Sequence, residues 1–187
     1  MRVRKHFIAI IIKQHYLCGM KKAFPPIADK HSKILILGTM PGEKSLELQQ
    51  YYGNRGNQFW KILFEIFGEE FSPDYNVRTN LLKQNGIALW DVLQHCEREG
   101  SLDSNIKNEA ANDFESFFKA HPQIKHVFFS SKNAAAYYDK YVGRREGIKY
   151  DVLPSPSGAN ASMRPAEKLK IWREKILPLV KGSGKNL

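Results

Sequence analysis

The stretch Lys33-Ile-Leu-Ile-Leu-Gly-Thr-Met-Pro-Gly-Glu-Lys-Ser45 decides the fold of this chain. After Lys33 it begins with a continuous apolar run that ends in Gly38, which is typical of a strand buried on both faces. The run is followed by a polar, glycine-containing loop. Parallel sheets bind ligands outside the carboxyl ends of such strands, so this loop is the first place to look for a site.

The same alternation of short apolar runs and helical patterns continues along the chain. Further strands are predicted over residues 86–90, 126–129 and 150–153. Helices are predicted from about residue 57, over 78–85, from 112 or 113 to about 121, over 133–141, and from 165 to about 178. The sequence therefore predicts an α/β fold, a three-layer α/β/α sandwich with a central, mainly parallel four-stranded sheet.

Length and composition favour one domain. The chain has 187 residues, of which 42% are hydrophobic, enough for a sizeable core. We expect a single domain over residues 20–181 and a flexible tail over 182–187. Residues 1–19 are interpreted as a basic extension, either a strand or a disordered arm, with Met20 as an alternative start.

Charge and cysteine content narrow the partners and the compartment. The net charge is +10, and the basic excess lies at the two ends of the sequence. Clustered cations favour a polyanion such as nucleic acid, although solvated charged ends explain them equally well. Cys18 and Cys96 show no zinc spacing, so we expect no metal or other cofactor and a reducing, cytoplasmic location. No apolar run approaches the roughly 20 residues of a membrane span, so no membrane partner is expected.

Two loops follow predicted strands and carry unusual residues. The loop after Leu37 resembles a phosphate-binding P-loop but has one residue too few between its glycines, which argues against a nucleotide triphosphatase. The other loop is Leu153-Pro-Ser-Pro-Ser-Gly-Ala-Asn-Ala161. Its prolines fix the backbone and its small residues allow close approach to a phosphate backbone; an ordinary turn is the alternative.

Together these loops resemble the uracil-DNA glycosylase superfamily, and within it the hypoxanthine-DNA glycosylase branch, over about residues 22–180. The resemblance rests on several motifs in one order: Phe24-Pro-Pro-Ile27, Ile34-Leu-Ile-Leu-Gly-Thr-Met-Pro-Gly42, Lys44-Ser-Leu46, Tyr51-Tyr-Gly53, Asn57-Gln-Phe-Trp60, Leu89-Trp-Asp-Val92, Ser101-Leu-Asp-Ser104, Asn112-Asp-Phe114 and Leu153-Pro-Ser-Pro-Ser157. It implies an enzyme that flips a deaminated base out of a duplex and hydrolyses its N-glycosidic bond.

Three positions depart from the patterns of related branches. Met40 replaces the Asn that positions water in the mismatch-uracil branch, and Leu153 replaces the His of the main uracil branch. Ser130-Ser131 follows the third strand, where the hypoxanthine branch often has Asn-Gly. The usual polar catalysts are therefore absent, and other residues must perform the chemistry.

Asn57 and Asp91 are the catalytic candidates. The resemblance implies that Asn57 of the N-x-F-W motif acts on water, sugar or base; capping the following helix is the alternative. Asp91 matches the position where the uracil branch binds its base with Asn. Its carboxylate could accept from N1–H of hypoxanthine or N3–H of uracil, act as a general base, or simply bind loop amides.

The remaining candidates bind base or DNA. Tyr52 is expected to stack on the flipped base, with Tyr51 as its rival and core packing as the alternative. Gly38, Thr39, Met40 and Asp91 complete the predicted base pocket. The predicted DNA-binding residues are Lys44, Ser45, Ser155, Ser157, Gly158, Asn160, Met163 and Arg164, with Asn160 or Met163 as the wedge that fills the gap left by the base.

The sequence thus favours a monofunctional, metal-independent DNA glycosylase that acts as a monomer on double-stranded DNA in base excision repair. Hypoxanthine is the favoured base and uracil the second. A DNA-binding relative without catalysis and a nucleoside hydrolase on the same fold remain alternatives. No lysine is singled out as a Schiff-base nucleophile, so strand cleavage is not expected.

Overall fold

The computed structural model describes residues 19–160 and 162–180. The predicted N-terminal extension, apart from Gly19, and the predicted tail over 182–187 lie outside this part of the chain.

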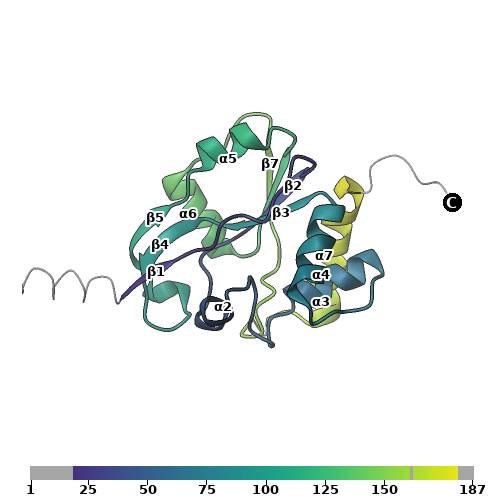
Figure 1. Ribbon diagram of the computed structural model, residues 1–187, viewed down its shortest axis with the longest axis horizontal. Helices are drawn as coiled ribbons and strands as arrows, with labels where there is room; N and C mark the ends of the chain where they lie inside the picture. Colours follow the sequence, from purple (N-terminus) through teal and green to yellow (C-terminus); the bar gives the residue numbers. More distant parts are fainter. Residues whose placement is uncertain (1–18, 161, 181–187) are drawn as a thin grey trace, which may run out of the picture.

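The centre of the molecule is a parallel four-stranded sheet (Figure 1). Its strands are β2 (Ile34–Gly38), β3 (Ile87–Asp91), β6 (His126–Phe129) and β7 (Lys149–Val152), in the spatial order β3-β2-β6-β7. Every residue of β2 and β3 is buried, as the continuous apolar runs predict. The predicted fold class is confirmed, and each predicted strand differs from the observed one by at most one residue at either end.

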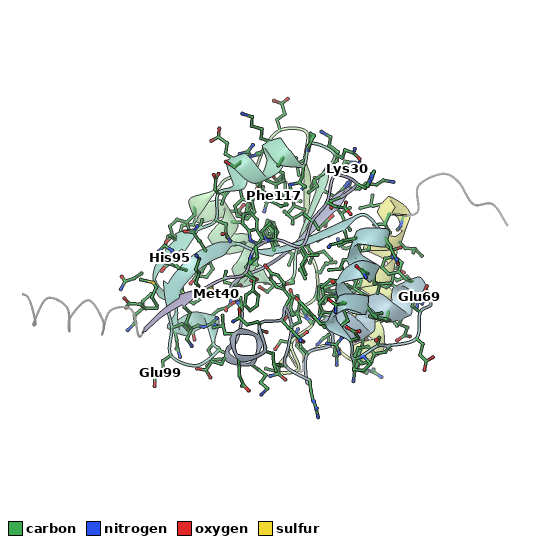
Figure 2. The ribbon with its side chains drawn as sticks, in the orientation of Figure 1. Lys30, Met40, Glu69, His95, Glu99 and Phe117 are labelled. Carbon is green, nitrogen blue, oxygen red and sulfur yellow. The ribbon has the colours of Figure 1, made fainter. Side chains whose placement is uncertain are left out.

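Helices cover both faces of this sheet (Figure 1). On one side lie α3 (Phe59–Phe67), α4 (Tyr75–Gln84) and α7 (Pro165–Val180), and on the other α5 (Phe114–Ala120) and α6 (Lys132–Tyr141). Aromatic side chains pack within and between these layers: Phe59 of α3 packs edge-on against Trp172 of α7 in the same layer. Phe117 of α5 points inward and packs on Trp90 of β3, with ring centroids 4.9 Å apart (Figure 2). None of the described helices is long and apolar enough to cross a membrane.

Two features were not predicted. A second, antiparallel sheet joins β1 (Met20–Lys22), β4 (Leu93–Glu97) and β5 (Lys107–Ala111) in the order β1-β4-β5. A short helix, α2 (Glu43–Leu48), occupies part of the predicted polar loop after β2. Helix α2 and the segment that joins β4 to β5 lie beside the carboxyl ends of β2 and β3 and help to enclose the space above them.

Candidate functional site

A cavity of about 980 Å³ opens at the carboxyl ends of the central strands, where the topology places ligand sites. Loops from β2, β3, β6 and β7 contribute to its wall. It brings together most of the residues selected from the sequence: Gly38, Thr39, Met40, Lys44, Ser45, Tyr52, Asn57, Asp91, Ser155, Ser157, Asn160 and Met163. Gly158 and Arg164 do not line it.

Asp91 reaches the cavity because its neighbour in the sheet is a glycine. The parallel register pairs Gly38 at the end of β2 with Asp91 at the end of β3. A Cβ atom at position 38 would lie 2.3 Å from Asp91 Oδ1, closer than any real contact allows. Gly38 is therefore required by the approach of this carboxyl group and not by turn geometry.

The Asp91 carboxyl is buried and incompletely hydrogen-bonded. Only 4% of the residue is exposed, and Oδ2 has no hydrogen-bond partner among the described residues. Burial, reinforced by the nearby Asp103 and opposed by Arg98, raises the pKa of Asp91 to about 8. At neutral pH the group is therefore mostly a neutral carboxylic acid, with one O–H donor and one C=O acceptor.

This raised pKa makes folding stability depend on pH in a definite direction. Above about pH 4 the unfolded chain has lost the Asp91 proton, whereas the folded chain keeps it up to about pH 8. Stability should therefore fall as pH rises through this window, by at most about 1.4 kcal/mol per pH unit from this group. Urea unfolding of wild type and Asp91→Asn at pH 5 to 8 tests this. The free energy of unfolding of wild type should fall relative to that of the variant as pH rises, because Asn does not titrate. If the free energies of unfolding of the two proteins changed with pH in parallel, the raised pKa of Asp91 would be contradicted.

Asn57 lies in the turn that leads into α3. Its Oδ1 accepts a hydrogen bond from Phe59 N at 2.9 Å, so the capping role is real. The side chain also lines the cavity, and Nδ2 donates to no described residue. The cap fixes the orientation of the amide and leaves its N–H donors free for a ligand.

Tyr52 packs one ring face on α3 and also lines the cavity. Its ring stacks on Phe59, with centroids 3.9 Å apart and planes 14° from parallel. The hydroxyl donates to Ser130 Oγ at 3.1 Å, and the backbone φ of 52° is unusual for a tyrosine. Because Phe59 covers one face, a base could stack only on the opposite face of the ring. The rival, Tyr51, is 3% exposed, and its hydroxyl is held by the carbonyl groups of Phe24 and Pro25.

Two of the three departures from related branches, Met40 and Leu153, are apolar wall residues. Met40 is 7% exposed and Leu153 is 1% exposed, and both line the cavity. Thr39 is also buried, and its carbonyl accepts from Leu93 N. These three residues shape the pocket, and they offer no acid–base group.

The loop over 153–160 is held in place from several sides. Trp172 Nε1 donates to Pro154 O at 2.9 Å, and the buried Lys168 Nζ donates to Asn160 O at 2.8 Å. The Ser155 and Ser157 hydroxyl oxygens accept from the amides of residues 157 and 159, so their O–H groups remain free to donate. The loop is thus rigid, with hydroxyl donors along it that suit phosphate oxygens.

This loop also contacts the turn that carries Asn57. Gln58 N donates to Pro156 O at 2.8 Å, and a Cβ at Gly158 would lie 2.6 Å from Gly56 O. We expect Gly158→Ala to lower the free energy of unfolding by about 1–3 kcal/mol, because a backbone carbonyl cannot move aside as a flexible side chain does. Denaturant unfolding measures this. An unchanged stability would show that the two segments separate freely.

Some predicted DNA-binding residues have structural partners. Ser45 is 6% exposed, and its Oγ accepts from Gly53 N at 3.0 Å, so it holds the loop that follows α2. Asn160 Nδ2 donates to Ser155 O, and its Oδ1 accepts from the Ser162 hydroxyl. Lys44 is exposed but pairs with Glu47 at 2.7 Å. Arg164 is exposed at the start of α7 and has no ion pair among the described residues.

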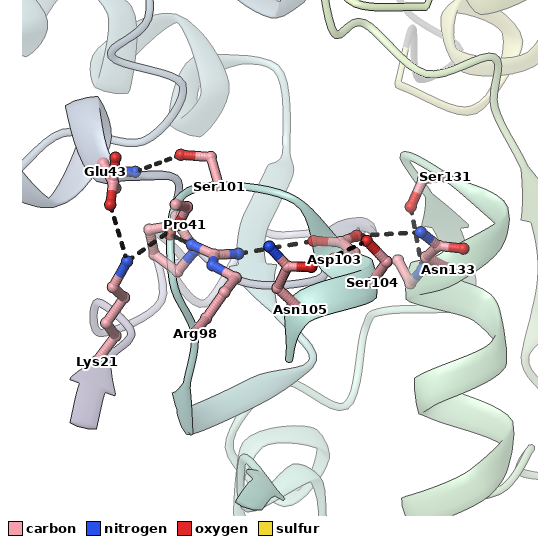
Figure 3. Close-up of polar contacts among 12 residues, drawn as sticks. Lys21, Pro41, Glu43, Arg98, Ser101, Asp103, Ser104, Asn105, Ser131 and Asn133 are labelled. Carbon is pink, nitrogen blue, oxygen red and sulfur yellow. Dashed lines mark hydrogen bonds and ion pairs between the residues drawn. The ribbon is translucent and has the colours of Figure 1, made fainter. Parts of the chain in front are cut away.

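The segment between β4 and β5, for which the sequence predicts no role, lines the cavity with Ser101, Leu102 and Asp103. It is held by Arg98, whose side chain is fully buried and donates to Pro41 O (Figure 3). The Ser101-Leu-Asp-Ser104 motif marked this segment, but only as part of a resemblance. No group of three His, Cys, Asp or Glu side chains that could hold a metal ion occurs over 19–160 and 162–180.

The fold and this strand-end cavity agree with a family comparison. A model described as the Uracil DNA glycosylase superfamily matches residues 25–175. The chain belongs to this superfamily, and it is a DNA glycosylase.

Individual relatives share most of the chain. A protein named hypoxanthine DNA glycosylase from Methanosarcina barkeri is 42% identical over 141 residues, which are 75% of this chain and 88% of that relative. One of the same name from Methanosarcina acetivorans is 40% identical over 142 residues, 75% of this chain and 89% of that relative. A solution NMR structure of a proposed uracil DNA glycosylase from M. acetivorans superposes with a TM-score of 0.74 at 37% identity. It covers 86% of this chain and 98% of that one.

Proposed function

We propose that this protein is a monofunctional glycosylase that removes hypoxanthine from double-stranded DNA. The observation that carries the proposal is the buried Asp91 carboxyl, neutral at pH 7 and with an unpartnered oxygen, in the wall of the cavity. An O–H donor beside a C=O acceptor complements the N1–H and C6=O edge of hypoxanthine. The names of the two relatives support the same base.

In this proposal Asn57 acts on the glycosidic bond. The bond electrons leave with the base, the sugar acquires oxocarbenium character, and a water oxygen adds to C1′. The proton that water releases ends on the departed base. Asn57 Oδ1 retains a lone pair for the water, and Nδ2 donates to the sugar or the leaving base. Hypoxanthine leaves more readily than adenine because its oxo group lets the ring hold negative charge.

Strand cleavage is not part of the proposal. A Schiff-base lysine must lose its proton, which requires burial or a neighbouring cation. The lysines that line the cavity, Lys44 and Lys132, are both exposed, and Lys44 is paired with Glu47. The product is therefore an intact strand with an abasic site.

We assign the DNA contacts to the loop over residues 153–160 and to the residue that precedes α7. Ser155 and Ser157 supply hydroxyl donors for phosphates beside the flipped nucleotide, and Arg164 supplies a cation. We also propose that the glycosylase domain spans residues 20–181 and works as a monomer in the cytoplasm. Cys96 is buried and not in a disulfide, which suits a reducing compartment.

The test incubates the protein with duplexes that carry hypoxanthine, uracil or xanthine, followed by alkali to cleave abasic sites. We expect alkali-labile product from the hypoxanthine duplex and intact strands without alkali. Product from uracil alone would move the substrate to uracil, whose N3–H and C4=O present a similar edge. Base release from free deoxyinosine at the same rate would favour a nucleoside hydrolase. Salt-sensitive duplex binding without product would favour a DNA-binding relative.

A further inference from the structure

An exposed leucine lies at the edge of the cavity. Leu102 is 66% exposed, the largest exposed fraction among the large hydrophobic residues of the described chain. Of the apolar side chains that line the cavity it is also the most exposed, ahead of Val152 at 38%. Single exposed leucines are common on protein surfaces, so the position needs support from its surroundings.

The residues on both sides of Leu102 are held by other parts of the chain (Figure 3). Lys21 Nζ from β1 donates to Gly100 O at 2.9 Å, and Glu43 N of α2 donates to Ser101 Oγ at 2.9 Å. On the other side, the buried Arg98 guanidinium lies 3.6 Å from Asp103 Oδ1. The leucine therefore sits on a rigid tip, which we call the 99–104 loop.

Burying an arginine at the base of the 99–104 loop costs free energy of folding, because the charge loses its hydration. Arg98 is 5% exposed, and its Nε and Nη1 have no hydrogen-bond partner among the described residues. Its guanidinium donates to Pro41 O in the loop that follows β2, and this contact fixes the position of the 99–104 loop. A loop that only connected two strands would not need such an anchor.

We propose that Leu102 is a DNA wedge, which enters the base stack when the target nucleotide is flipped into the cavity. A rigid apolar side chain suits this role, because proteins that unstack duplex DNA insert Leu, Ile, Met or Phe between bases. The proposal rests on the proposed function and adds to it a contact from the 99–104 loop. Of the two residues predicted for this role, Asn160 is less suited, since both ends of its side-chain amide are engaged within its own segment. Met163 also lines the cavity but is half-buried, so it presents less of its side chain than Leu102 does.

The first experiment compares excision from duplex and from single-stranded DNA by wild type and Leu102→Ala. A wedge is needed only where a neighbouring pair must be unstacked. We expect Leu102→Ala to slow excision from duplex by roughly tenfold or more, and from single strands by less than about twofold. Leu102→Met should restore most of the duplex rate. The matched control is Val77→Ala, a 44% exposed apolar residue of α4 that does not line the cavity, and it should match wild type on both substrates.

A second measurement separates failure of this proposal from failure of the base assignment. A duplex with a stable abasic analogue mimics the flipped state, and a 2-aminopurine beside it reports local unstacking. Wild type should bind this duplex and raise the fluorescence, whereas Leu102→Ala should bind more weakly and raise it less. A wild type that shows this pattern but does not release hypoxanthine would overturn the base assignment alone. Wild-type values for Leu102→Ala on both DNA forms and on the abasic duplex would overturn the wedge.

Discussion

Asn57→Ala is expected to lower the single-turnover rate of base excision by roughly tenfold or more, since one positioned polar group typically contributes about 10²–10⁴. The physical reason is the free Nδ2 beside the cavity, together with an Oδ1 that the Phe59 amide holds in one orientation. With Met40 and Leu153 forming apolar wall, no other group is available to replace the lost amide at those two positions. The measurement is excess enzyme on a hypoxanthine duplex, quenched with alkali.

Alanine at position 57 also removes a helix cap, which costs about 1 kcal/mol of stability. Asn57→Ser is the matched control, because its hydroxyl oxygen can still accept from Phe59 N while the amide is gone. We expect Asn57→Ser to unfold near the wild-type denaturant concentration and yet excise as slowly as Asn57→Ala. Wild-type excision by Asn57→Ser would mean that capping is the residue's whole contribution, and catalysis would then have to be sought at Asp91.

Gly38→Ala should lower the excision rate by about 10²-fold, although it adds only one methyl group and changes no charge. The new Cβ would lie 2.3 Å from Asp91 Oδ1, so the buried carboxyl must turn away from its present position. A carboxyl displaced by an ångström no longer matches the edge of the base. Single-turnover excision of hypoxanthine measures the effect.

A double-mutant cycle identifies the cause of that loss. If Gly38→Ala acts through the carboxyl group, it should cost little further activity in an Asp91→Ala background, because the clashing atom is absent. Losses that add fully in the double variant would show that Gly38→Ala harms the site by another route. Denaturant unfolding of all four proteins checks that each remains folded at the assay temperature.

The central sheet could be predicted because each strand is a short apolar run between turn signals, as in Lys33–Leu37 and His126–Phe129. Burial on both faces makes such strands continuous in hydrophobicity, and little else produces that pattern. The helices on its faces were found from single apolar faces, such as Phe59, Leu63 and Phe67. Helix α4 starts three residues earlier than predicted, where Asp74 accepts from Asn76 N.

The second sheet could not be predicted in the same way. The pairing of strands β4 and β5 shifts register twice, so no sustained alternation of polar and apolar residues marks them. Strand β1 pairs with β4 across more than 70 residues of chain, a contact that local patterns do not encode. Helix α2 has a single buried residue, Ser45, and therefore shows no apolar face.

The candidate site was located by the order of its loops, but its chemistry depends on tertiary contacts. The sequence left Asp91 between base binding, general base and structural duties. Its burial and its unpartnered oxygen exist only in the folded chain, where Gly38 leaves room for the carboxyl group. Burial, and to a smaller extent Asp103, raise its pKa against the opposing effect of Arg98. The sequence also did not show that Ser45 is only 6% exposed and that its Oγ accepts from Gly53 N; its contact with phosphate stays a prediction. The exposed fraction of a side chain helps to decide between a binding role and a structural role, and a local sequence motif does not determine it.

The contact between Gly56 and Gly158 has a practical consequence for protein engineering. These residues belong to segments about 100 positions apart, yet their backbones touch and Gln58 N is bonded to Pro156 O. The turn before α3 and the proline-containing loop therefore form one interchangeable part. A chimera that takes only one of them from a relative would carry mismatched halves, so grafts intended to alter substrate choice should exchange residues 54–58 and 153–160 together.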